Sequence, residues 1–404
     1  MSGNTPDLWA ATTEDPPSSP PPSAVSPLFG RGASIVDQHG NPVMLHGIGW
    51  FEGYSNPGWL AGLDQVNWQH TMKDMVRLGF NCVRMHTFQR GVLNVMSGGD
   101  RTWPMWHGLN KTLNADLVGL GYLQVVDKVL DFAATIGLRV LIDSHSSEGS
   151  VPNNGGRWAI GSVSDADFLR QWQYLANRWK GKPALVGYDV INEPQKCTWG
   201  DGEASDVRKM YSDIGNAILA IDPRPLIVCE GPALWSKSSR SNFAGTHSGV
   251  FSEPDLSLAQ KFPVTCTVPE GAPPGTTKVC YSVHDYPVPW TMGADSGDDC
   301  IARMEACWGY LVTKDIAPVW LTELGCAPQN RAQIDYLDTL IPYMAGTSRG
   351  YVRKPCHSAW WCWMPFGFFG RQQIDNGTIT AWQNPSLLPQ NAKWQRQLFA
   401  CKAA

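Results

Sequence analysis

Two glutamates stand where apolar runs of the sequence end, and together they could perform one particular kind of chemistry. Glu193 closes the run LVGYDVIN at 185–192, and Glu323 closes the run at 317–325. Cleavage of a glycosidic bond needs one carboxyl group that donates a proton to the leaving oxygen and a second that attacks the anomeric carbon. Carboxyl groups about 5–5.5 Å apart do this with retention of configuration. Taken singly, Glu193 could cap a helix and Glu323 could be a salt-bridged structural acid.

Other polar and aromatic side chains end the remaining apolar runs. They are Arg84, His86, Asp143, His145, Asn192, Glu230, His284 and Tyr286, and the last run carries Trp361 and Trp363. A buried charge is costly unless it is paired, so many ionisable groups at such positions indicate a functional site. Each residue alone has a structural explanation, such as a core histidine, an ion pair or a packed ring. Glu230 competes with the two glutamates for a catalytic role.

The runs that carry these residues have the pattern of buried strands. They are continuous rather than alternating, which is typical of strands buried on both faces, and they lie at 44–49, 80–86, 138–145, 185–192, 225–231, 278–286, 317–325 and 357–365. Amphipathic helical patterns lie between them, at 67–79, 121–137, 165–181, 204–222, 298–314, 331–344 (interrupted by Pro342) and 390–399.

This alternation predicts an α/β fold, a (β/α)8 TIM barrel that forms a single domain over residues 30–404. A doubly wound open sheet is disfavoured because no GxGxxG follows the first strand. The carboxyl ends of barrel strands meet at one rim, and strands four and seven place Glu193 and Glu323 on opposite sides of its mouth. Long segments at 87–119, 146–164 and 240–277 are expected to surround that rim.

Composition excludes several other classes of protein. The net charge of -4 gives no footprint for nucleic acid or an anionic membrane. No apolar run reaches the roughly 18 residues of a membrane span. Nineteen Trp residues among 404 are many, and flat indole faces suit sugars among other ligands. No CxxC pair is present, so a zinc site is not expected. We expect no metal, no other cofactor and a monomer.

Residues 1–29 differ from the rest of the chain because they are rich in Pro and Ser and lack the apolar core of a signal peptide. We expect a disordered or extended linker there. We also expect the chain to be part of a secreted protein whose export signal lies outside it. A carbohydrate-binding module tethered through the linker would suit this arrangement, and an intact cytosolic protein is the alternative.

Ten of the 11 Cys residues fall into two groups by their surroundings. Cys82, Cys229, Cys326 and Cys362 lie in or beside apolar runs, where buried free thiols are expected. Six others look like three disulfides of unknown connectivity, which implies an oxidising compartment. Cys266 and Cys280 bracket a loop, Cys300 and Cys307 lie seven residues apart, and Cys356 and Cys401 flank the C-terminal segment.

The order of the strand-end residues resembles glycoside hydrolase family 5, the (β/α)8-barrel group that contains many endo-β-1,4-glucanases, or cellulases. The resemblance runs from GIGWFEGY (47–54) to WCWMPFG (361–367) and includes Asn192-Glu193-Pro194 and His284-x-Tyr286. VGYDVINEP (186–194) and WGYLVTKDIAPVWLTELG (308–325) resemble the bacterial endoglucanase branch in particular.

The resemblance implies a role for each matching position. Glu193 corresponds to the acid/base and Glu323 to the nucleophile. Supporting and substrate-binding roles fall to Arg84 and Tyr286 (bonded to the nucleophile), His284 (beside the acid/base), His145 (substrate-side network), Asn192 (sugar 2-hydroxyl), Trp361 (platform for the sugar before the cleaved bond), and Trp363 and Trp50 (further substrate contacts).

The resulting expectation is a secreted retaining endo-glycosidase that hydrolyses β-1,4-glucan, including cellulose and its soluble derivatives. The sequence departs from the branch at Gly49 and Glu52, in the 262–300 region and at MPFGFFGRQQID (364–375), so substrate preference is less fixed than chemistry. β-Mannanase, xyloglucanase and mixed-linkage glucanase remain alternatives on the same barrel. So do a carbohydrate-binding barrel without catalysis and a metal-dependent hydrolase that uses Asp143, His145 and His284.

Overall fold

The barrel and its surrounding helices contain most of the residues that the structure describes. The computed structural model describes residues 27–50, 60–64, 66–98, 109–146, 163–194, 197–232, 255–286, 296–325, 331–351, 353–363, 372–375 and 378–381, together with four positions between 394 and 400. Most of the expected N-terminal linker therefore lies outside the described residues. So does much of the three long segments and of the predicted helix at 390–399.

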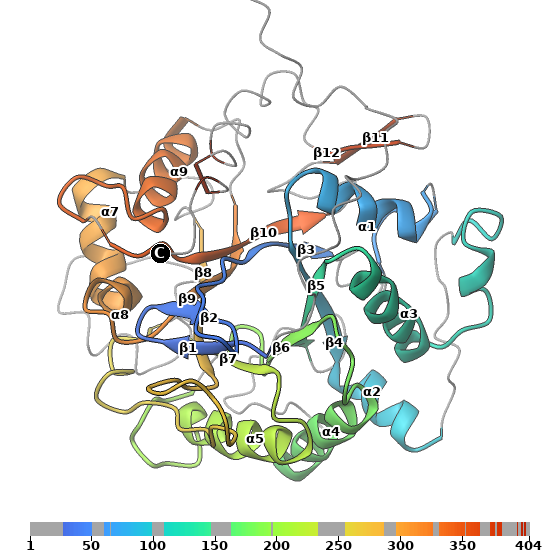
Figure 1. Ribbon diagram of the computed structural model, residues 1–404, viewed down its shortest axis with the longest axis horizontal. Coiled ribbons are helices and arrows are strands. Elements are labelled where there is room, and N and C mark those ends of the chain that lie inside the picture. Colours follow the sequence, from blue (N-terminus) through green and yellow to red (C-terminus); the bar gives the residue numbers. More distant parts are fainter. Residues whose placement is uncertain are drawn as a thin grey trace, which may run out of the picture.

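Eight parallel strands close into a barrel in the order in which they occur along the chain (Figure 1). They are β3 (His46–Trp50), β4 (Cys82–Phe88), β5 (Arg139–Ser146), β6 (Leu185–Asp189), β7 (Leu226–Glu230), β8 (Val279–Asp285), β9 (Val319–Leu324) and β10 (His357–Trp363). The last strand pairs with the first, from Ser358↔His46 to Trp363↔Trp50, which closes the sheet. The predicted (β/α)8 fold and all eight predicted strands are confirmed.

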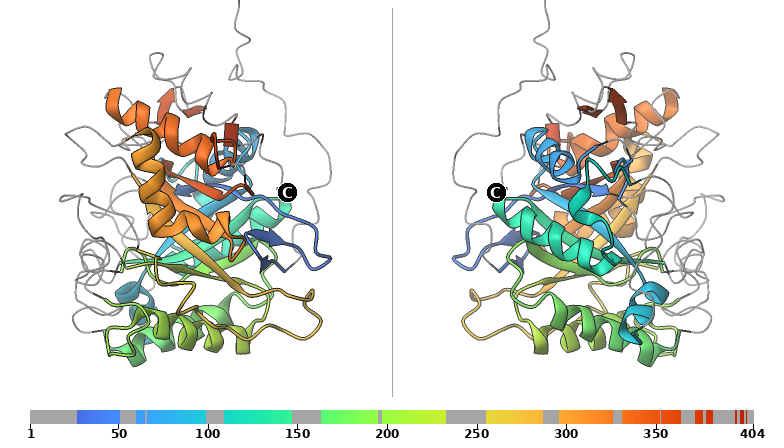
Figure 2. Two further views of the ribbon diagram at one scale, coloured as in Figure 1. Left: turned by 90° about the vertical axis from the view of Figure 1, so that its left-hand side faces the viewer. Right: turned by 90° about the vertical axis from the view of Figure 1, so that its right-hand side faces the viewer.

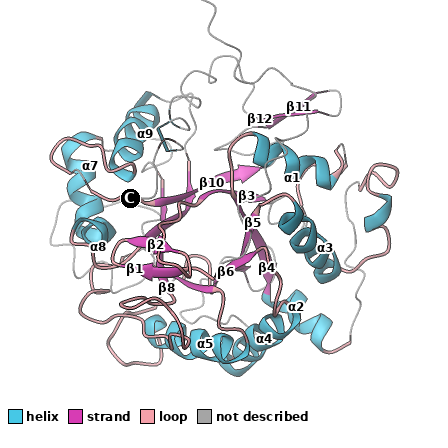
Figure 3. Cartoon of the chain, viewed as in Figure 1, coloured by secondary structure: helices cyan, strands magenta, loops and turns pink. Residues whose placement is uncertain are grey.

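Helices form a ring around the strands (Figures 1 and 3). They are α1 (Trp68–Arg77), α2 (Gln89–Met96), α3 (Tyr122–Thr135), α4 (Asp165–Arg178), α5 (Val207–Ile221), α7 (Gly297–Met304), α8 (Tyr310–Thr313) and α9 (Arg331–Met344). A π-helical segment, Glu305–Gly309, joins α7 to α8. Side-chain caps set several helix starts, as at α4, where the Ser164 hydroxyl accepts the N–H of Asp167.

Two details of the helix prediction are wrong. Helix α9 runs through Pro342 to Met344, so the proline does not interrupt it. Helix α2 falls inside the segment at 87–119 that was expected to be a loop. It is only 8 residues long and contains Gly91, so its pattern is too short to stand out.

A short N-terminal hairpin covers the amino-terminal end of the barrel. Strands β1 (Phe29–Arg31) and β2 (Ser34–Val36) pair antiparallel. Figure 2 shows the hairpin, in dark blue, at one end of the barrel. The hairpin is tied to the barrel by Gly30 N–H, which donates to Thr277 O at 2.9 Å. Its side chains share one apolar cluster with inward-facing strand residues: Leu28, Ile35, Leu45, Cys82, Leu141, Val186, Leu226, Val228, Cys280 and Trp320.

A second hairpin, β11 (Gln372–Asp375) with β12 (Thr378–Ala381), follows β10 and was not predicted. None of the helices that the structure describes is both long and apolar enough to cross a membrane.

The disulfide prediction is not supported by the structure. Cys266, Cys280 and Cys356 carry free thiols, and Cys401 lies outside the described residues. Cys280 belongs to the inner cluster of the barrel, whereas Cys266 packs outside the strands against Gly215 of α5, so their thiols face different parts of the core. Cys300 and Cys307 lie seven residues apart along one continuous helix. Because a helix rises about 1.5 Å per residue, their Cα atoms lie farther apart than a disulfide can span.

Candidate active site

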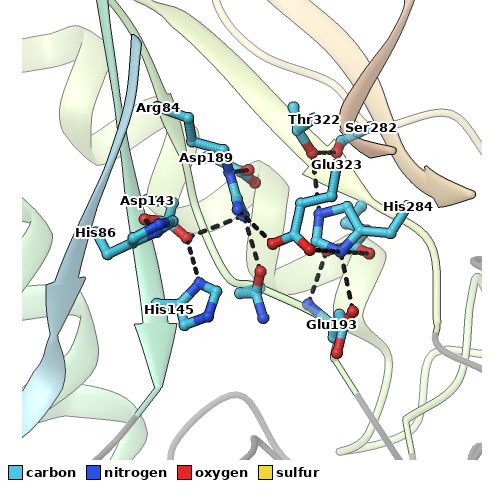
Figure 4. Close-up of polar contacts among 12 residues, drawn as sticks. Arg84, His86, Asp143, His145, Asp189, Glu193, Ser282, His284, Thr322 and Glu323 are labelled. Carbon is cyan, nitrogen blue, oxygen red and sulfur yellow. Dashed lines mark hydrogen bonds and ion pairs between the residues drawn. The ribbon is translucent and has the colours of Figure 1, made fainter. Parts of the chain in front are cut away.

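A fully buried arginine organises the polar residues at the carboxyl ends of the strands (Figure 4). The Arg84 guanidinium, on β4, donates to Glu323 Oε1 at 2.6 Å, to Asp189 Oδ2 at 3.0 Å and to Asn192 Oδ1 at 2.8 Å. It also forms an ion pair of 2.9 Å with Asp143 Oδ2. One cation therefore holds side chains from β5, β6, β9 and the turn after β6 in a single network. The bond to Asn192 also fixes the orientation of that amide.

Glu323, at the end of β9, receives a donor on each carboxylate oxygen. Arg84 binds Oε1, and the hydroxyl of Tyr286, just after β8, donates to Oε2 at 2.7 Å. The side chain is only 5% exposed. Both oxygens are therefore held in place, with donors directed at the negative charge that a nucleophilic carboxylate carries.

Glu193 lies beyond the end of β6 in an unusual backbone conformation, with φ of 43°. Its N–H donates to Glu230 Oε2 at 2.7 Å, and its Oε1 lies 3.0 Å from His284 Nδ1. The side chain is 28% exposed, so it is reachable although much of it is covered. Burial raises the pKa of Glu193 above its ordinary value, only partly offset by the charges of His145 and Arg84, as suits a group that must donate a proton.

The two carboxylates lie close together, and both face Nδ1 of His284. Glu193, His284 and Glu323 offer atoms that all lie within 4.8 Å of one another, and Glu323 Oε2 is 3.6 Å from His284 Nδ1. This closeness is compatible with the carboxyl separation of about 5–5.5 Å that retaining glycosidases have.

His284 links Glu193 to a chain of hydroxyl groups on two strands. Its Nε2 lies 3.1 Å from Thr322 Oγ1, which in turn bonds to Ser282 Oγ. Burial lowers the pKa of His284 to about 3, so the imidazole is neutral near neutral pH. A neutral imidazole carries one ring proton, and its tautomer decides whether Nδ1 donates to Glu193 or accepts from it.

A second cluster adjoins the first through Asp143. His86 Nδ1 lies 2.7 Å from Asp143 Oδ1, and His145 Nδ1 lies 3.0 Å from Oδ2. Although burial alone would raise the pKa of Asp143, the positive charge of Arg84 and the imidazole partners lower it well below its usual range. Trp361, on β10 and partly exposed, stacks parallel to the His145 ring, with centroids 5.5 Å apart.

The structure thus brings most of the predicted site residues together, and two stand apart. Trp50 and Trp363 are fully buried, and the Trp50 indole donates to Ala61 O at 3.0 Å inside the core. Their expected substrate contacts stay predictions. Phe51, Glu52 and the segment 364–371 lie outside the described residues.

The residues of the metal-dependent alternative do not converge among the described residues. Asp143 and His145 group with His86, whereas His284 groups with Glu193 and Glu323. Arg84 lies between these two groups and contacts a carboxylate of each, so a positive charge is already supplied to both.

Two parts of the network had no role in the sequence prediction: Asp189 binds Arg84, and the Ser282–Thr322 pair supports His284. Glu230, which the sequence analysis named as a competing strand-end acid, binds the backbone of Glu193. Burial raises the pKa of Asp189 to about 7, with Arg84 opposing that effect. A polar residue inside an apolar run, such as Asp189 in LVGYDVIN, was the available signal in the sequence.

Comparisons with known proteins show which proteins the chain is similar to. The family model described as Cellulase (glycosyl hydrolase family 5) matches residues 36–367. An endoglucanase of Paenibacillus polymyxa is 30% identical over 310 residues, which cover 73% of this chain and 70% of that protein. The major extracellular endoglucanase of Xanthomonas campestris pv. campestris is 32% identical over 249 residues, 60% of this chain and 46% of that protein.

Solved structures are similar over nearly the whole chain. The catalytic domain of the Xanthomonas endoglucanase has a TM-score of 0.73 and 25% identity, and the match covers 92% of this chain and 99% of that one. A hyperthermostable endocellulase has a TM-score of 0.75 at 24% identity, covering 94% of this chain and 99% of that one, and supports the fold.

Proposed function

The chain belongs to the cellulase family, glycosyl hydrolase family 5, and we propose that it is a retaining endo-β-1,4-glucanase with Glu193 as acid/base and Glu323 as nucleophile. The observation that carries this proposal is the pair of carboxylates whose oxygens lie within 4.8 Å of each other beside His284. Their different surroundings also divide the two roles. Arg84 and Tyr286 donate to Glu323, whereas burial raises the pKa of the more exposed Glu193.

In the first step Glu323 attacks the anomeric carbon and forms a glycosyl ester, while the bond from that carbon to the leaving oxygen breaks. Glu193 gives its proton to the leaving oxygen, so the departing sugar leaves as a neutral alcohol. In the second step Glu193 takes a proton from water, and the resulting nucleophile replaces Glu323 at the same carbon. Two inversions give overall retention.

Other residues of the network would hold the sugar beside these groups. The fixed amide of Asn192 is placed to bind the 2-hydroxyl of the sugar that becomes attached to Glu323. The partly exposed ring of Trp361, supported by His145, would form the platform beneath that sugar. Arg84 and Tyr286 would orient the nucleophile.

The proposed substrate is a β-linked polysaccharide outside the cell. Both relatives described above are endoglucanases by name, and the Xanthomonas protein is named extracellular. We accordingly propose that this chain works as a secreted monomer. Tethering to a carbohydrate-binding module through residues 1–29 is a further part of this proposal.

Product analysis by NMR on a cello-oligosaccharide tests the proposal, because it reports substrate, cleavage position and anomeric configuration together. We expect internal cleavage with β-configured products at early times. Parallel assays on carboxymethylcellulose, glucomannan and mixed-linkage glucan rank the possible substrates. Activity on mannan alone, or α-configured first products, would overturn the proposal.

Substitution of the two glutamates tests the site separately. Glu193→Gln and Glu323→Gln should each reduce kcat on the oligosaccharide by at least roughly 100-fold, since each removes one essential step. Glu305→Gln, in the π-helical segment outside the site, serves as the control. Parent-like rates in both site variants would show that the reaction occurs elsewhere.

A further inference from the structure

Glu230 is a buried carboxyl group that the two-carboxylate mechanism leaves without a role. It ends β7, the strand next to β6, and its side chain is fully buried. Its Oε2 accepts the backbone N–H of Glu193 at 2.7 Å. Its Oε1 receives no hydrogen bond among the described residues, and His284 Nδ1 lies 3.4 Å from it. Glu230 thus touches the acid through the main chain.

The backbone that Glu230 holds is one that L-residues rarely adopt. Glu193 has φ of 43°, in the left-handed region, and such a conformation persists only where its surroundings enforce it. The N–H of Asn192 is bonded to Ser144 O at 3.0 Å. Residue 194 is proline and has no N–H. The hydrogen bond from Glu193 to Glu230 is therefore the backbone anchor at the position where the chain turns.

Glu230 is itself firmly placed, so it can act as such an anchor. It pairs with Ser282 of β8 in the barrel sheet, and the hydroxyl of Tyr211, on α5, donates to its carbonyl oxygen at 2.8 Å. An acceptor fixed to a barrel strand can hold the turn at Glu193 in register with Glu323, which ends another strand of the same barrel.

We propose that Glu230 is a positioning residue that holds the turn at Glu193, through the backbone N–H, in the conformation that aims the acid at the leaving oxygen. This inference rests on the proposed function, because it takes Glu193 as the acid/base. The role requires an acceptor oxygen and not a negative charge.

The electrostatic surroundings agree with a neutral anchor. Burial raises the pKa of Glu230 well above its ordinary value, and the charges of Glu193 and Asp189 raise it further, against the opposing effects of the hydrogen bond from the Glu193 N–H and of the Arg84 charge. His284, which also faces Glu230, is neutral near neutral pH because burial lowers its pKa to about 3. Glutamine is therefore a close replacement for Glu230, whereas methionine keeps its length and removes the acceptor.

The test compares Glu230→Gln and Glu230→Met on two substrates that differ in their need for an acid. When a cello-oligosaccharide is cleaved, the departing sugar is a poor leaving group unless an acid protonates its oxygen. When 2,4-dinitrophenyl β-cellobioside is cleaved, the leaving group is 2,4-dinitrophenolate, which departs without protonation. We expect Glu230→Met to lower kcat/KM roughly 100-fold on the oligosaccharide and by less than about threefold on the aryl glycoside. Glu230→Gln should keep most of the activity on both.

Three results would overturn the inference. They are parent-like kcat/KM of Glu230→Met on the oligosaccharide, an equal loss on both substrates, and equal impairment of Glu230→Gln and Glu230→Met. Thermal melting of each variant checks folding. If Glu230→Met does not fold, Glu230→Asp, which withdraws the acceptor by one methylene, takes its place with the same expected selectivity.

Glu193→Gln separates this inference from the proposed function. It should show the same preference for the aryl glycoside, more strongly than Glu230→Met. If Glu193→Gln lacks that preference, the assignment of the acid is wrong. If it has the preference and the Glu230 variants do not, only the role of Glu230 is wrong.

Discussion

At the scale of single residues, the site depends on how one cation is shared. Arg84 is fully buried and contacts Asp143, Asp189 and Glu323 at 2.6 to 3.0 Å. A buried charge without such partners would be costly, and each partner carboxylate is stabilised in return. The positive charge reaches both Glu323, the proposed nucleophile, and the cluster that supports Trp361, so Arg84 couples the two halves of the site.

Tyr286 provides the second donor to Glu323, and its removal should weaken the nucleophile's placement. A hydrogen bond to a charged group contributes about 1.5–3 kcal/mol, so Tyr286→Phe should lower kcat/KM on a cello-oligosaccharide roughly 10- to 100-fold. Tyr188→Phe removes a buried hydroxyl that bonds to Leu175 O and should leave kcat/KM unchanged. Equal effects of the two substitutions would contradict this role of Tyr286.

The raised pKa of Glu193 predicts how kcat/KM falls on the alkaline side of its pH profile. An acid must be protonated to act, so activity is present below the pKa of Glu193 and is lost as the pH rises through it. The alkaline limb of kcat/KM on a cello-oligosaccharide should therefore lie above pH 4.5. The aryl cellobioside needs no acid and should lack this limb. A limb at or below pH 4.5, or the same limb with both substrates, would disagree with the assignment.

At the scale of elements, the strand ends position the chemistry and the N-terminal hairpin seals the opposite end of the barrel. Lys278, just before β8, is buried beneath that hairpin. Its Nζ donates to Leu28 O at 2.7 Å and to Arg224 O at 2.6 Å, and it lies 4.3 Å from the centre of the Phe29 ring. The two carbonyls join the hairpin and the α5–β7 turn through one side chain.

Lys278 should give the barrel a stability that increases with pH. Burial lowers its pKa from 10.5 to about 7 in the folded state. Between these values the unfolded chain holds a proton that the folded chain has lost, so the free energy of unfolding rises with pH by up to about 1.4 kcal/mol per unit. Lys278→Met should remove this slope between pH 7 and 10, as measured by urea unfolding. Lys209→Met, on the exposed face of α5, should keep it, and an unchanged slope in Lys278→Met would contradict the account.

At the scale of the whole molecule, the sequence predicts the eight barrel strands better than it predicts the short hairpins and the state of the cysteines. Eight continuous apolar runs predict eight strands, because strands covered on both faces have such runs. The hairpin at 29–36 escapes notice because its strands are 3 residues each. The disulfide prediction is not supported because the spacing of cysteines along the sequence does not reveal that Cys266 and Cys280 face different parts of the core.

Site residues at or near the end of an apolar run were easier to predict from the sequence than site residues in the interior of a run. Glu193, Glu323 and His284 lie at or near strand ends, so the barrel topology alone brings them to one rim. Ser282 and Thr322 are buried within strands, and small hydroxyl residues in a strand are common without any function. The left-handed backbone conformation at Glu193 was also not predictable from the sequence, because glutamate is not a residue type that favours this conformation.

Trapping of the covalent intermediate tests the central claim most directly. A 2-deoxy-2-fluoro-β-cellobioside with a good leaving group should form a glycosyl ester that turns over slowly, because the fluorine slows both steps. Mass spectrometry of peptides from the labelled protein should place the sugar on Glu323, and Glu323→Gln should take up no label. A sugar on Glu193 or Glu230, or no adduct in an enzyme that still hydrolyses cello-oligosaccharides, would contradict the account.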